Sequence, residues 1–286
     1  MIRDGSLRAH HRRVDASEWS EQWVSLRGRR MLVRTSPPVD GATPIVHVHG
    51  FAISGRSLMP TAERLTDTAQ NLVPDLPGYG VSERWEHTLG IPALATVVEE
   101  LLDELGHDKV VLLGNSMGCA VALEFAHLAP ERVERLVLVS PAGGQHNQPF
   151  ARALVQLARD GVRESPRMAS LAVPDYLKFG PLSTFALFGE LTRFPALERF
   201  LRMRVPALAV VGSRDPLMPE PRRIAELARI TEGNLTFVLV EGAAHAMNFS
   251  HPGELAHVVR SWLADEPIKD DPNEPGLSRV LRFRSA

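Results

Sequence analysis

The sequence predicts an α/β fold: a mostly parallel eight-stranded sheet with helices on both faces, plus a helical insert. Short apolar runs of strand length alternate with amphipathic stretches of helical length along most of the chain. The later runs are almost unbroken in Val, Leu and Ile, which is typical of parallel strands buried on both faces. One connection between these runs is far longer than the others and is rich in Phe.

The expected elements follow one another in a regular order. Residues 1–18 are polar and predict a loosely ordered N-terminal extension. Two β-like runs at 19–26 and 29–35 meet at Arg27-Gly28 and predict an antiparallel hairpin. The sequence then predicts six strands, at Pro44–His49, Asn71–Pro74, Val110–Gly114, Leu136–Ser140, Ala207–Gly212 and Phe237–Glu241, and helices near 58–68, 91–105, 117–128, 219–230 and 252–264.

The long connection, 141–205, has about 65 residues, whereas connections in compact domains have a median of about 4–6. It contains six of the eleven Phe residues in the chain. Its prolines are expected to divide it into short helices. Because Phe-rich helices need an apolar surface to cover, we interpret the segment as a helical lid over a site beneath it. The residues concerned are Phe150, Phe179, Phe185, Phe188, Phe194 and Phe200, with Pro166, Pro174, Pro181 and Pro195.

The rest of the chain divides into a core and a tail. Residues 19–140 and 206–264 form the predicted α/β core, which the insert interrupts. With 286 residues, the chain is long enough for one sizeable hydrophobic core. The segment 265–286 begins with a stretch rich in Asp and Pro and predicts a weakly ordered C-terminal tail.

The composition, 44% hydrophobic and 23% charged, is that of an ordinary globular protein. A formal net charge of −2 argues against nucleic acid or an anionic membrane as the partner. We identify neither a signal peptide nor an apolar stretch of membrane-spanning length, so a cytoplasmic location is expected. The single cysteine, Cys119, excludes an intramolecular disulfide and is expected to pack in the core. The oligomeric state is left open.

The most informative motif is Gly-Asn-Ser-Met-Gly at 114–118. It follows an apolar run at Lys109–Leu113 and precedes a helical stretch that starts at Cys119. A Gly-x-Ser-x-Gly motif between a strand and a helix puts the serine on a sharp turn with its hydroxyl exposed. The glycines are needed because the strand and the helix approach closely there. Ser116 is therefore the candidate nucleophile.

A serine hydroxyl is a poor nucleophile at neutral pH and needs a base that is oriented by a third group. Asp215 follows the strand expected at 207–212, and His245 follows the strand expected at 237–241. Because ligands bind at the carboxyl ends of parallel strands, both residues are expected beside Ser116. We expect Ser116 to attack, His245 to take its proton and Asp215 to orient the imidazole.

An oxyanion that develops on the substrate needs backbone donors, and the sequence predicts two. One is the N–H of Met117, directly after the nucleophile. The other is the N–H of Phe51, in a His-Gly-Phe-Ala loop that follows the strand expected at 44–49. His49 is expected to hold this loop by hydrogen bonds. No metal is expected at His47 and His49, because no third ligand cluster accompanies them.

Four motifs in this order resemble the α/β-hydrolase superfamily in its serine-nucleophile branch. They are the His-Gly loop at 49–50, the Asp-Leu-Pro-Gly-Tyr-Gly-Val-Ser turn at 75–82, the serine motif, and the acid and base after later strands. The resemblance spans residues 19–264. It implies a hydrolase without cofactor or metal, and Asp75 is expected to be structural. Serine as the nucleophile excludes branches similar to haloalkane dehalogenases and epoxide hydrolases, which use a carboxylate.

The expected reaction is carboxylesterase-like: hydrolysis of a small to medium ester with an apolar acyl or alcohol part, through an acyl-enzyme at Ser116. The serine motif also resembles that of C–C bond hydrolases of meta-cleavage (ring-fission) products. It looks like the motif of cofactor-free haloperoxidases and perhydrolases as well. The ester reaction is ranked first because Ala246 stands where the C–C hydrolases have a tryptophan after the histidine.

The alternatives differ in the residues that they require and in whether the ligand is turned over. A C–C hydrolase would need a cation to hold the carboxylate of its substrate. A ligand receptor or interaction protein derived from a hydrolase is the alternative from another class, and it would bind a ligand without turnover. The candidate cations in the insert are Arg152, Arg159, Arg163, Arg167, Arg193 and Arg199.

Overall fold

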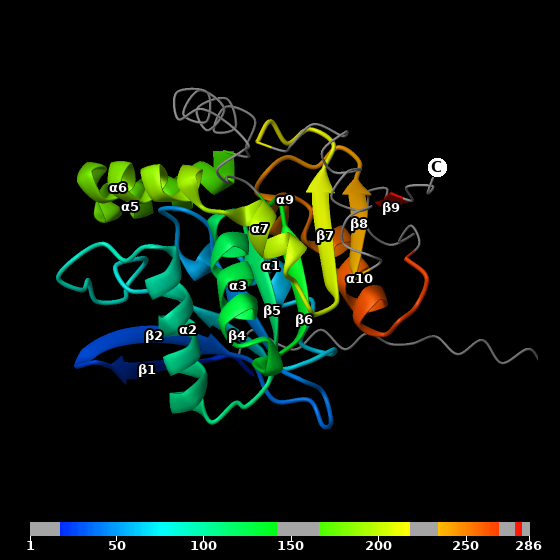
Figure 1. Ribbon diagram of the computed structural model, residues 1–286, viewed down its shortest axis with the longest axis horizontal. Coiled ribbons are helices and arrows are strands. Elements are labelled where there is room, and N and C mark those ends of the chain that lie inside the picture. Colours follow the sequence, from blue (N-terminus) through cyan, green and yellow to red (C-terminus); the bar gives the residue numbers. More distant parts are fainter. Residues whose placement is uncertain (1–17, 142–165, 218–233, 269–277, 282–286) are drawn as a thin grey trace, which may run out of the picture.

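The computed structural model describes residues 18–141, 166–217, 234–268 and 278–281. Within these residues, nine strands form one sheet in the order β1-β2-β4-β3-β5-β6-β7-β8-β9 (Figure 1). The strands are β1 Ser20–Leu26, β2 Arg29–Thr35, β3 Ile45–Val48, β4 Asn71–Pro74, β5 Val110–Asn115, β6 Val133–Val139, β7 Ala207–Gly212, β8 Leu235–Val240 and β9 Ser278–Leu281.

The sheet is parallel from β4 to β8 and antiparallel at its two ends. All the strands that the sequence predicts are present, so the mostly parallel α/β sheet is confirmed. β9 was not predicted. It lies in the tail at 265–286, and its four residues are too few to display a strand pattern. The segments 1–17, 269–277 and 282–286 lie outside the described residues.

Helices cover both faces of the sheet. α2 and α3 pack on one face, and α10 packs on the other together with α9. The short helix α1 contacts both α9 and α10. The bounds of these helices are α1 Met59–Ala62, α2 Ile91–Leu105, α3 Met117–Leu128, α9 Met247–Ser250 and α10 Pro252–Leu263.

One expected helix is shorter than the sequence predicts, and another cannot be compared with the prediction. The helix expected at 58–68 ends at Ala62. After it the chain continues in tight turns, where the N–H of Leu65 bonds to the carbonyl of Ala62, three residues back instead of four. The helix expected at 219–230 lies outside the described residues.

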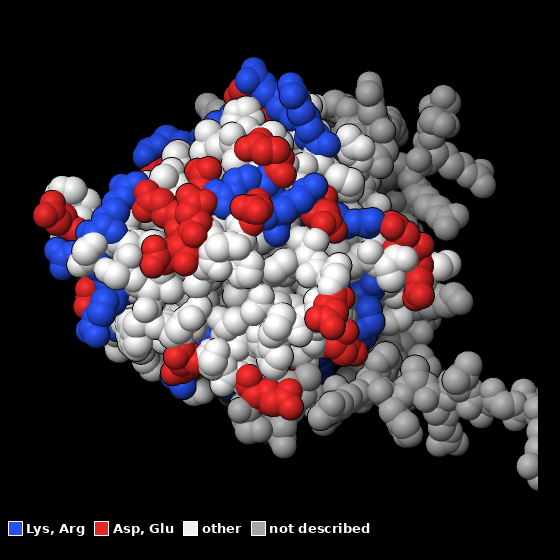
Figure 2. All heavy atoms as spheres, turned by 90° about the horizontal axis from the view of Figure 1, so that it is seen from below, with Lys and Arg blue, Asp and Glu red and all other residues white. Residues whose placement is uncertain are grey.

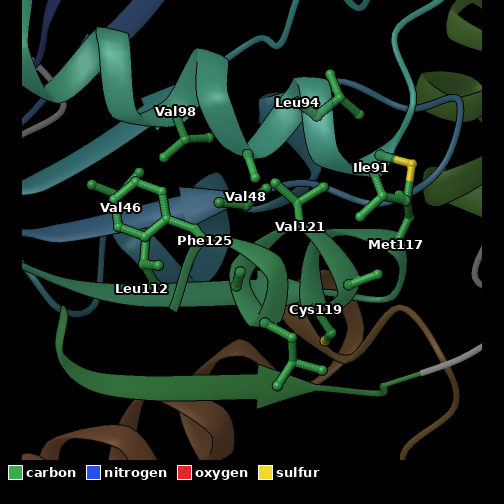
Figure 3. Packing of buried hydrophobic residues seen from close by; sticks show 14 of the residues in the cluster. Val46, Val48, Ile91, Leu94, Val98, Leu112, Met117, Cys119, Val121 and Phe125 are labelled. Atoms are coloured by element: carbon green, nitrogen blue, oxygen red, sulfur yellow. The ribbon is translucent and has the colours of Figure 1, made fainter. Parts of the chain in front are cut away.

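The strands send alternate side chains to the two helical layers. In β5, Leu112 belongs to the cluster formed with α2 and α3, whereas Val111 belongs to the cluster formed with α10. Figure 3 shows Val98 of α2 and Phe125 of α3 turned toward the same part of the first cluster. This division into two cores explains why the central strands are apolar at nearly every position.

The insert forms helices α5 (Pro166–Phe179), α6 (Pro181–Arg193) and α7 (Ala196–Leu201). Each begins at or directly after a proline, as the sequence predicts. Pro174 is the exception: it was expected to break a helix but lies inside α5. Proline removes one N–H donor, and here the turns on either side keep the helix. Residues 142–165 lie outside the described part of the chain.

α5 and α6 lie at the end of the molecule toward which the arrows of β7 and β8 point (Figure 1). The insert therefore lies at the same end as the carboxyl ends of these strands. Phe185 is exposed, and Phe150 lies outside the described residues. A role for the insert as a lid remains a prediction. The Phe residues that are buried are Phe179, Phe188, Phe194 and Phe200.

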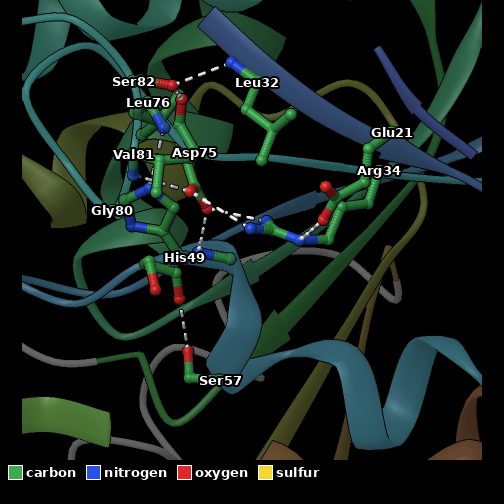
Figure 4. A network of polar contacts seen from close by, with 12 residues as sticks. Glu21, Leu32, Arg34, His49, Ser57, Asp75, Leu76, Gly80, Val81 and Ser82 are labelled. Atoms are coloured by element: carbon green, nitrogen blue, oxygen red, sulfur yellow. Dashed lines mark hydrogen bonds and ion pairs between the residues drawn. The ribbon is translucent and has the colours of Figure 1, made fainter.

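Asp75 follows β4 and carries a fully buried carboxylate that connects several loops (Figure 4). Its Oδ1 accepts hydrogen bonds from Gly55 N–H and from Arg34 Nη1, both at 2.9 Å. Its Oδ2 accepts one from Val81 N–H at 3.1 Å. Its main-chain carbonyl accepts the hydroxyl of Ser82 at 2.6 Å. These contacts agree with the structural role that the sequence predicts for Asp75.

His47 lies in β3, fully buried, with its Nε2 2.7 Å from Oδ1 of Asn71 in β4. Burial removes the hydration that the charged imidazolium needs, and it lowers the pKa of His47 from 6.5 to about 4. The folded protein therefore keeps this histidine neutral at pH values where the unfolded chain already binds a proton.

The surface carries both signs of charge. On the face shown in Figure 2, basic side chains lie among acidic ones. Exposed ion pairs include Arg30 with Glu83 at 2.9 Å and Arg135 with Asp265 at 2.7 Å. Crossing a membrane would take a longer and more apolar helix than any in the described residues.

We expect Asp75→Ala to lower the free energy of unfolding by about 3–5 kcal/mol, because Arg34 would keep a buried charge without its main partner. The side chain of Arg34 is 7% exposed and that of Asp75 is 0% exposed. Urea denaturation followed by circular dichroism measures the change.

Asp265→Ala is the matched control, because its carboxylate pairs with Arg135 at 2.7 Å but is 76% exposed. We expect this variant to lose much less stability than Asp75→Ala, because water screens an exposed ion pair. Equal losses in the two variants would contradict the assignment of Asp75 as the central buried contact.

We expect the free energy of unfolding to fall as the pH drops below 6.5, with His47 contributing about 2 kcal/mol between pH 7 and pH 5. The sign follows because the unfolded state binds more protons than the folded state in this range. In His47→Gln, whose amide can still donate to Asn71 but does not titrate, the fall should be smaller by that amount. Urea denaturation of both proteins at both pH values tests this, and an equal fall would refute it.

Candidate active site

Ser116 stands between β5 and α3 in a strained backbone conformation. Its φ of 54° and ψ of −115° are rare for a residue with a side chain. A Cβ atom on Gly118 would overlap the carbonyl oxygen of Val48, and a Cβ atom on Gly114 would overlap the carbonyl group of Gly118. Both positions therefore have to be glycine, for the reason the sequence indicates: strand and helix meet here at close approach.

The loops after β7 and β8 are held together in a similar way. A Cβ atom on Gly212, the last residue of β7, would overlap the carbonyl oxygen of Ala243. The N–H of Arg214 donates to the same carbonyl at 3.0 Å. This contact joins the two loops that carry Asp215 and His245.

The structure brings the three predicted side chains into one hydrogen-bonded chain. Nε2 of His245 is 2.8 Å from Oγ of Ser116, and Nδ1 of His245 is 2.8 Å from Oδ2 of Asp215. The other carboxylate oxygen of Asp215 accepts the N–H of Leu217 at 2.8 Å. The side chain of His245 is 9% exposed and that of Asp215 is fully buried. Little water competes for these contacts.

This arrangement determines where the protons lie. A carboxylate can only accept, so Nδ1 of His245 carries a proton and donates it to Asp215. In the neutral imidazole, Nε2 is then the acceptor and can take the hydroxyl proton of Ser116. The geometry can therefore activate the serine and stabilise the imidazolium that results.

The loop after β3 lies against the serine. A Cβ atom on Gly50 would lie 3.4 Å from Cβ of Ser116, which places Gly50 in contact with the serine turn. Phe51 follows and is buried, and Ala52 adopts a left-handed backbone with φ 55°. Met117 is the first residue of α3, where main-chain N–H groups have no partner within the helix. Both segments that carry the predicted donors thus adjoin Ser116, and their binding of an oxyanion remains a prediction.

His49 holds the start of this loop. Its Nε2 accepts the N–H of Leu76 at 3.0 Å, and its Nδ1 donates to the carbonyl of Gly50 at 3.0 Å. Because a backbone N–H only donates, Nε2 carries no proton and the ring is neutral. Burial lowers the pKa of His49, which agrees with the neutral form. In the described ranges, no three or more His, Cys, Asp or Glu side chains form a group able to hold a metal ion.

An aromatic cluster, which the sequence does not predict as part of the site, lies beside the predicted oxyanion residues. Tyr79 stacks on Phe179 with ring centroids 4.6 Å apart, and its hydroxyl is 3.7 Å from Sδ of Met117. The ring of Phe51 is 6.2 Å from that of Phe179 and 5.7 Å from that of Phe188. Tyr79 lies in a Pro-Gly-Tyr-Gly turn, and a large aromatic residue between two glycines is the signal that could have indicated it.

Arg199 and Cys119 do not join the site. Arg199, a candidate cation, pairs with the buried carboxylate of Glu124 in α3 at 2.6 Å. Sγ of Cys119 lies 3.1 Å from the carbonyl oxygen of Gly114, and burial raises the pKa of this thiol. Cys119 is thus a packing residue in the described structure. Arg152, Arg159 and Arg163 lie outside the described residues.

Comparisons with known proteins concern the fold and the family of this chain. The family model described as the alpha/beta hydrolase fold matches residues 43–173. The chain is 30% identical over 301 residues to an uncharacterized protein of Mycobacterium bovis, an alignment that covers 91% of this chain and 86% of that protein. It is 26% identical over 217 residues to a poly(3-hydroxyalkanoate) depolymerase of Ectopseudomonas oleovorans, covering 68% of this chain and 76% of the depolymerase.

Two further matches carry less information: one covers only about half of the relative, and the other shows the fold alone. The dihydrolipoyllysine-residue acetyltransferase component of the acetoin cleaving system of Pseudomonas putida is 32% identical over 206 residues, which are 63% of this chain but only 54% of that relative. The crystal structure of a membrane phospholipase A, a bacterial virulence factor, matches with a TM-score of 0.75 at 20% identity over 87% of each chain. With a relative matched over most of both lengths and a family model that spans β3 to α5, the chain belongs to the alpha/beta hydrolase family.

Proposed function

We propose that this hydrolase cleaves a small to medium carboxylic ester by way of an acyl-enzyme at Ser116. The observation that carries the proposal is the chain of two 2.8 Å hydrogen bonds from Ser116 through His245 to Asp215. All three residues follow the carboxyl ends of parallel strands, where ligands bind in sheets of this kind. The similarity to a poly(3-hydroxyalkanoate) depolymerase supports an ester bond as the target.

In the proposed reaction, Ser116 attacks the ester carbonyl while His245 takes the hydroxyl proton. The carbonyl oxygen becomes an oxyanion, which the N–H groups of Phe51 and Met117 bind. His245 then returns the proton to the leaving alcohol, and the acyl group stays on Ser116. A water molecule that His245 deprotonates attacks the acyl-enzyme and releases the acid. Asp215 stabilises the imidazolium in both halves of the reaction.

The surroundings favour a substrate with an apolar part. Phe51 and Tyr79 are buried beside the serine turn, and Phe179 and Phe188 of the insert are buried against them. Such a cluster binds apolar groups and keeps bulk water from the acyl-enzyme. Arg199 is held by Glu124, so it is not the cation that a C–C hydrolase would need.

We expect Ser116→Ala to lower kcat for p-nitrophenyl butyrate by roughly 10⁴- to 10⁶-fold, because the nucleophile of a triad cannot be replaced by its partners. The variant should also lose all labelling by a fluorophosphonate probe. Release of p-nitrophenol and gel fluorescence of the labelled protein measure the two effects.

Ser140→Ala is the matched control. Ser140 directly follows the neighbouring strand β6, is fully buried and also has a positive φ, of 49°. Its hydroxyl has no hydrogen-bond partner among the described atoms, so its loss should change neither labelling nor turnover. A wild type that is not labelled, or turnover that survives in Ser116→Ala, would rule out the proposed function.

A further inference from the structure

We propose that Asp175, on α5 of the insert, is a positioning residue that fixes the loop carrying the N–H of Phe51. The proposal rests on the proposed function, because that N–H is one of its two oxyanion donors. It assigns to the insert a part in catalysis beyond covering the site: the insert would hold half of the oxyanion hole in place.

The contact that carries the proposal is a hydrogen bond between the insert and the main chain of the loop. Oδ2 of Asp175 accepts the N–H of Ser54 at 2.8 Å in a partly buried setting. The next residue, Gly55, donates its N–H to the buried carboxylate of Asp75 at 2.9 Å. Two carboxylates thus hold successive amides, one from the core and one from the insert. Charge-assisted bonds of this kind are stronger than neutral ones.

The loop needs such anchors because its backbone is strained. Ala52 lies between Phe51 and Ser54 with φ 55°, a left-handed conformation that costs a residue with a side chain about 1–2 kcal/mol. Strained conformations persist only where the surrounding contacts hold them. His49 fixes the chain before Phe51 through Gly50, and Asp175 fixes it after Phe51 through Ser54.

The insert also holds the side chain of Phe51. The ring centroids of Tyr176 and Phe179, on the same helix as Asp175, are each 6.2 Å from that of Phe51. Phe188 of α6 lies 5.7 Å away. The end of α5 is itself tied to the core, because Nη2 of Arg84 donates to the carbonyl of Phe179 at 2.9 Å. The C-terminal part of α5 therefore contacts this loop both at the main chain of Ser54 and at the side chain of Phe51.

A donor stabilises the oxyanion only if it lies about 2.7–3.1 Å from the position that the oxygen takes in the transition state. Without Asp175, the amide of Ser54 loses its acceptor and the strained loop can relax. The N–H of Phe51, three residues earlier, then spends less time in the productive orientation. Because the oxyanion exists only in the transition state and the intermediate, the loss should appear in kcat and leave KM nearly unchanged.

The experiment compares Asp175→Ala, Asp175→Asn and Glu190→Ala in the full chain. Glu190, on α6, is the matched control because it is also an insert carboxylate that accepts a core main-chain N–H, that of Ile91 at 2.6 Å. That bond lies at the start of α2 and not on the loop at 49–55. Asp175→Asn keeps an oxygen that can accept from Ser54, so it tests rescue by a conservative change.

We expect Asp175→Ala to lower kcat for p-nitrophenyl butyrate by roughly 10- to 100-fold, less than the 10²- to 10³-fold loss of a whole donor. KM should change little. Asp175→Asn should recover most of the rate, and Glu190→Ala should keep the rate of the wild type. Hydrogen exchange measured by mass spectrometry should become faster in Asp175→Ala for peptides covering 50–55, and stay unchanged there in Glu190→Ala.

Three results would overturn the proposal: unchanged exchange at 50–55 in Asp175→Ala, faster exchange without a fall in kcat, or an equal fall in kcat in Glu190→Ala. The last would mean that general loosening of the insert is responsible. A failure of the proposed function is recognised separately, because the wild type would then resist the fluorophosphonate probe. In that case the exchange data still decide whether Asp175 anchors the loop.

Discussion

The close approach of main-chain segments around Ser116 is the constraint on which the site depends. α3 starts against the end of β3, with Gly118 directly beside the carbonyl of Val48. This contact brings the loop after β3 to the serine, while Gly212 and Ala243 bring the loops of the acid and the base together. These two glycines, which carry no side chain, thereby determine how the polar side chains meet. A methyl group at either of them would separate elements that the chemistry needs in contact.

Carboxylates that accept main-chain N–H groups fix the loops at the carboxyl edge of the sheet. Asp75 holds Gly55, Asp175 holds Ser54, and Asp215 holds the N–H of Leu217 while it also bonds His245. Loops lack the regular ladder of a sheet, so they need such acceptors to keep one conformation. Each bond is charge-assisted, and those of Asp75 and Asp215 are shielded from water, which strengthens them. Aspartate residues thus stabilise the loops, and one of them also orients the histidine of the candidate site.

The sequence predicts the parts of this structure that have a local signal. β3 to β8, α2, α3 and α10 are marked by apolar runs and helical periodicity, and Ser116, Asp215 and His245 by their places after strands. The bond between Ser54 and Asp175 joins residues 121 positions apart, and no local pattern reports it. The residues around Tyr79 indicate a turn, but nothing near them in the sequence indicates that the ring of Phe179 stacks on Tyr79. β9 is too short for periodicity, and α5 tolerates Pro174 against its local preference.

β9 has a consequence for how molecules of this protein meet one another. It pairs antiparallel with β8 and becomes the last strand on that side of the described sheet. Without it, the six residues of β8 would present a row of unpaired amide and carbonyl groups, and such an open edge recruits strands from other chains. The protein supplies this cover from its own C-terminal segment, and β9 itself is only four residues long. So short an outer strand offers a poor template for edge-to-edge pairing with a strand of another chain.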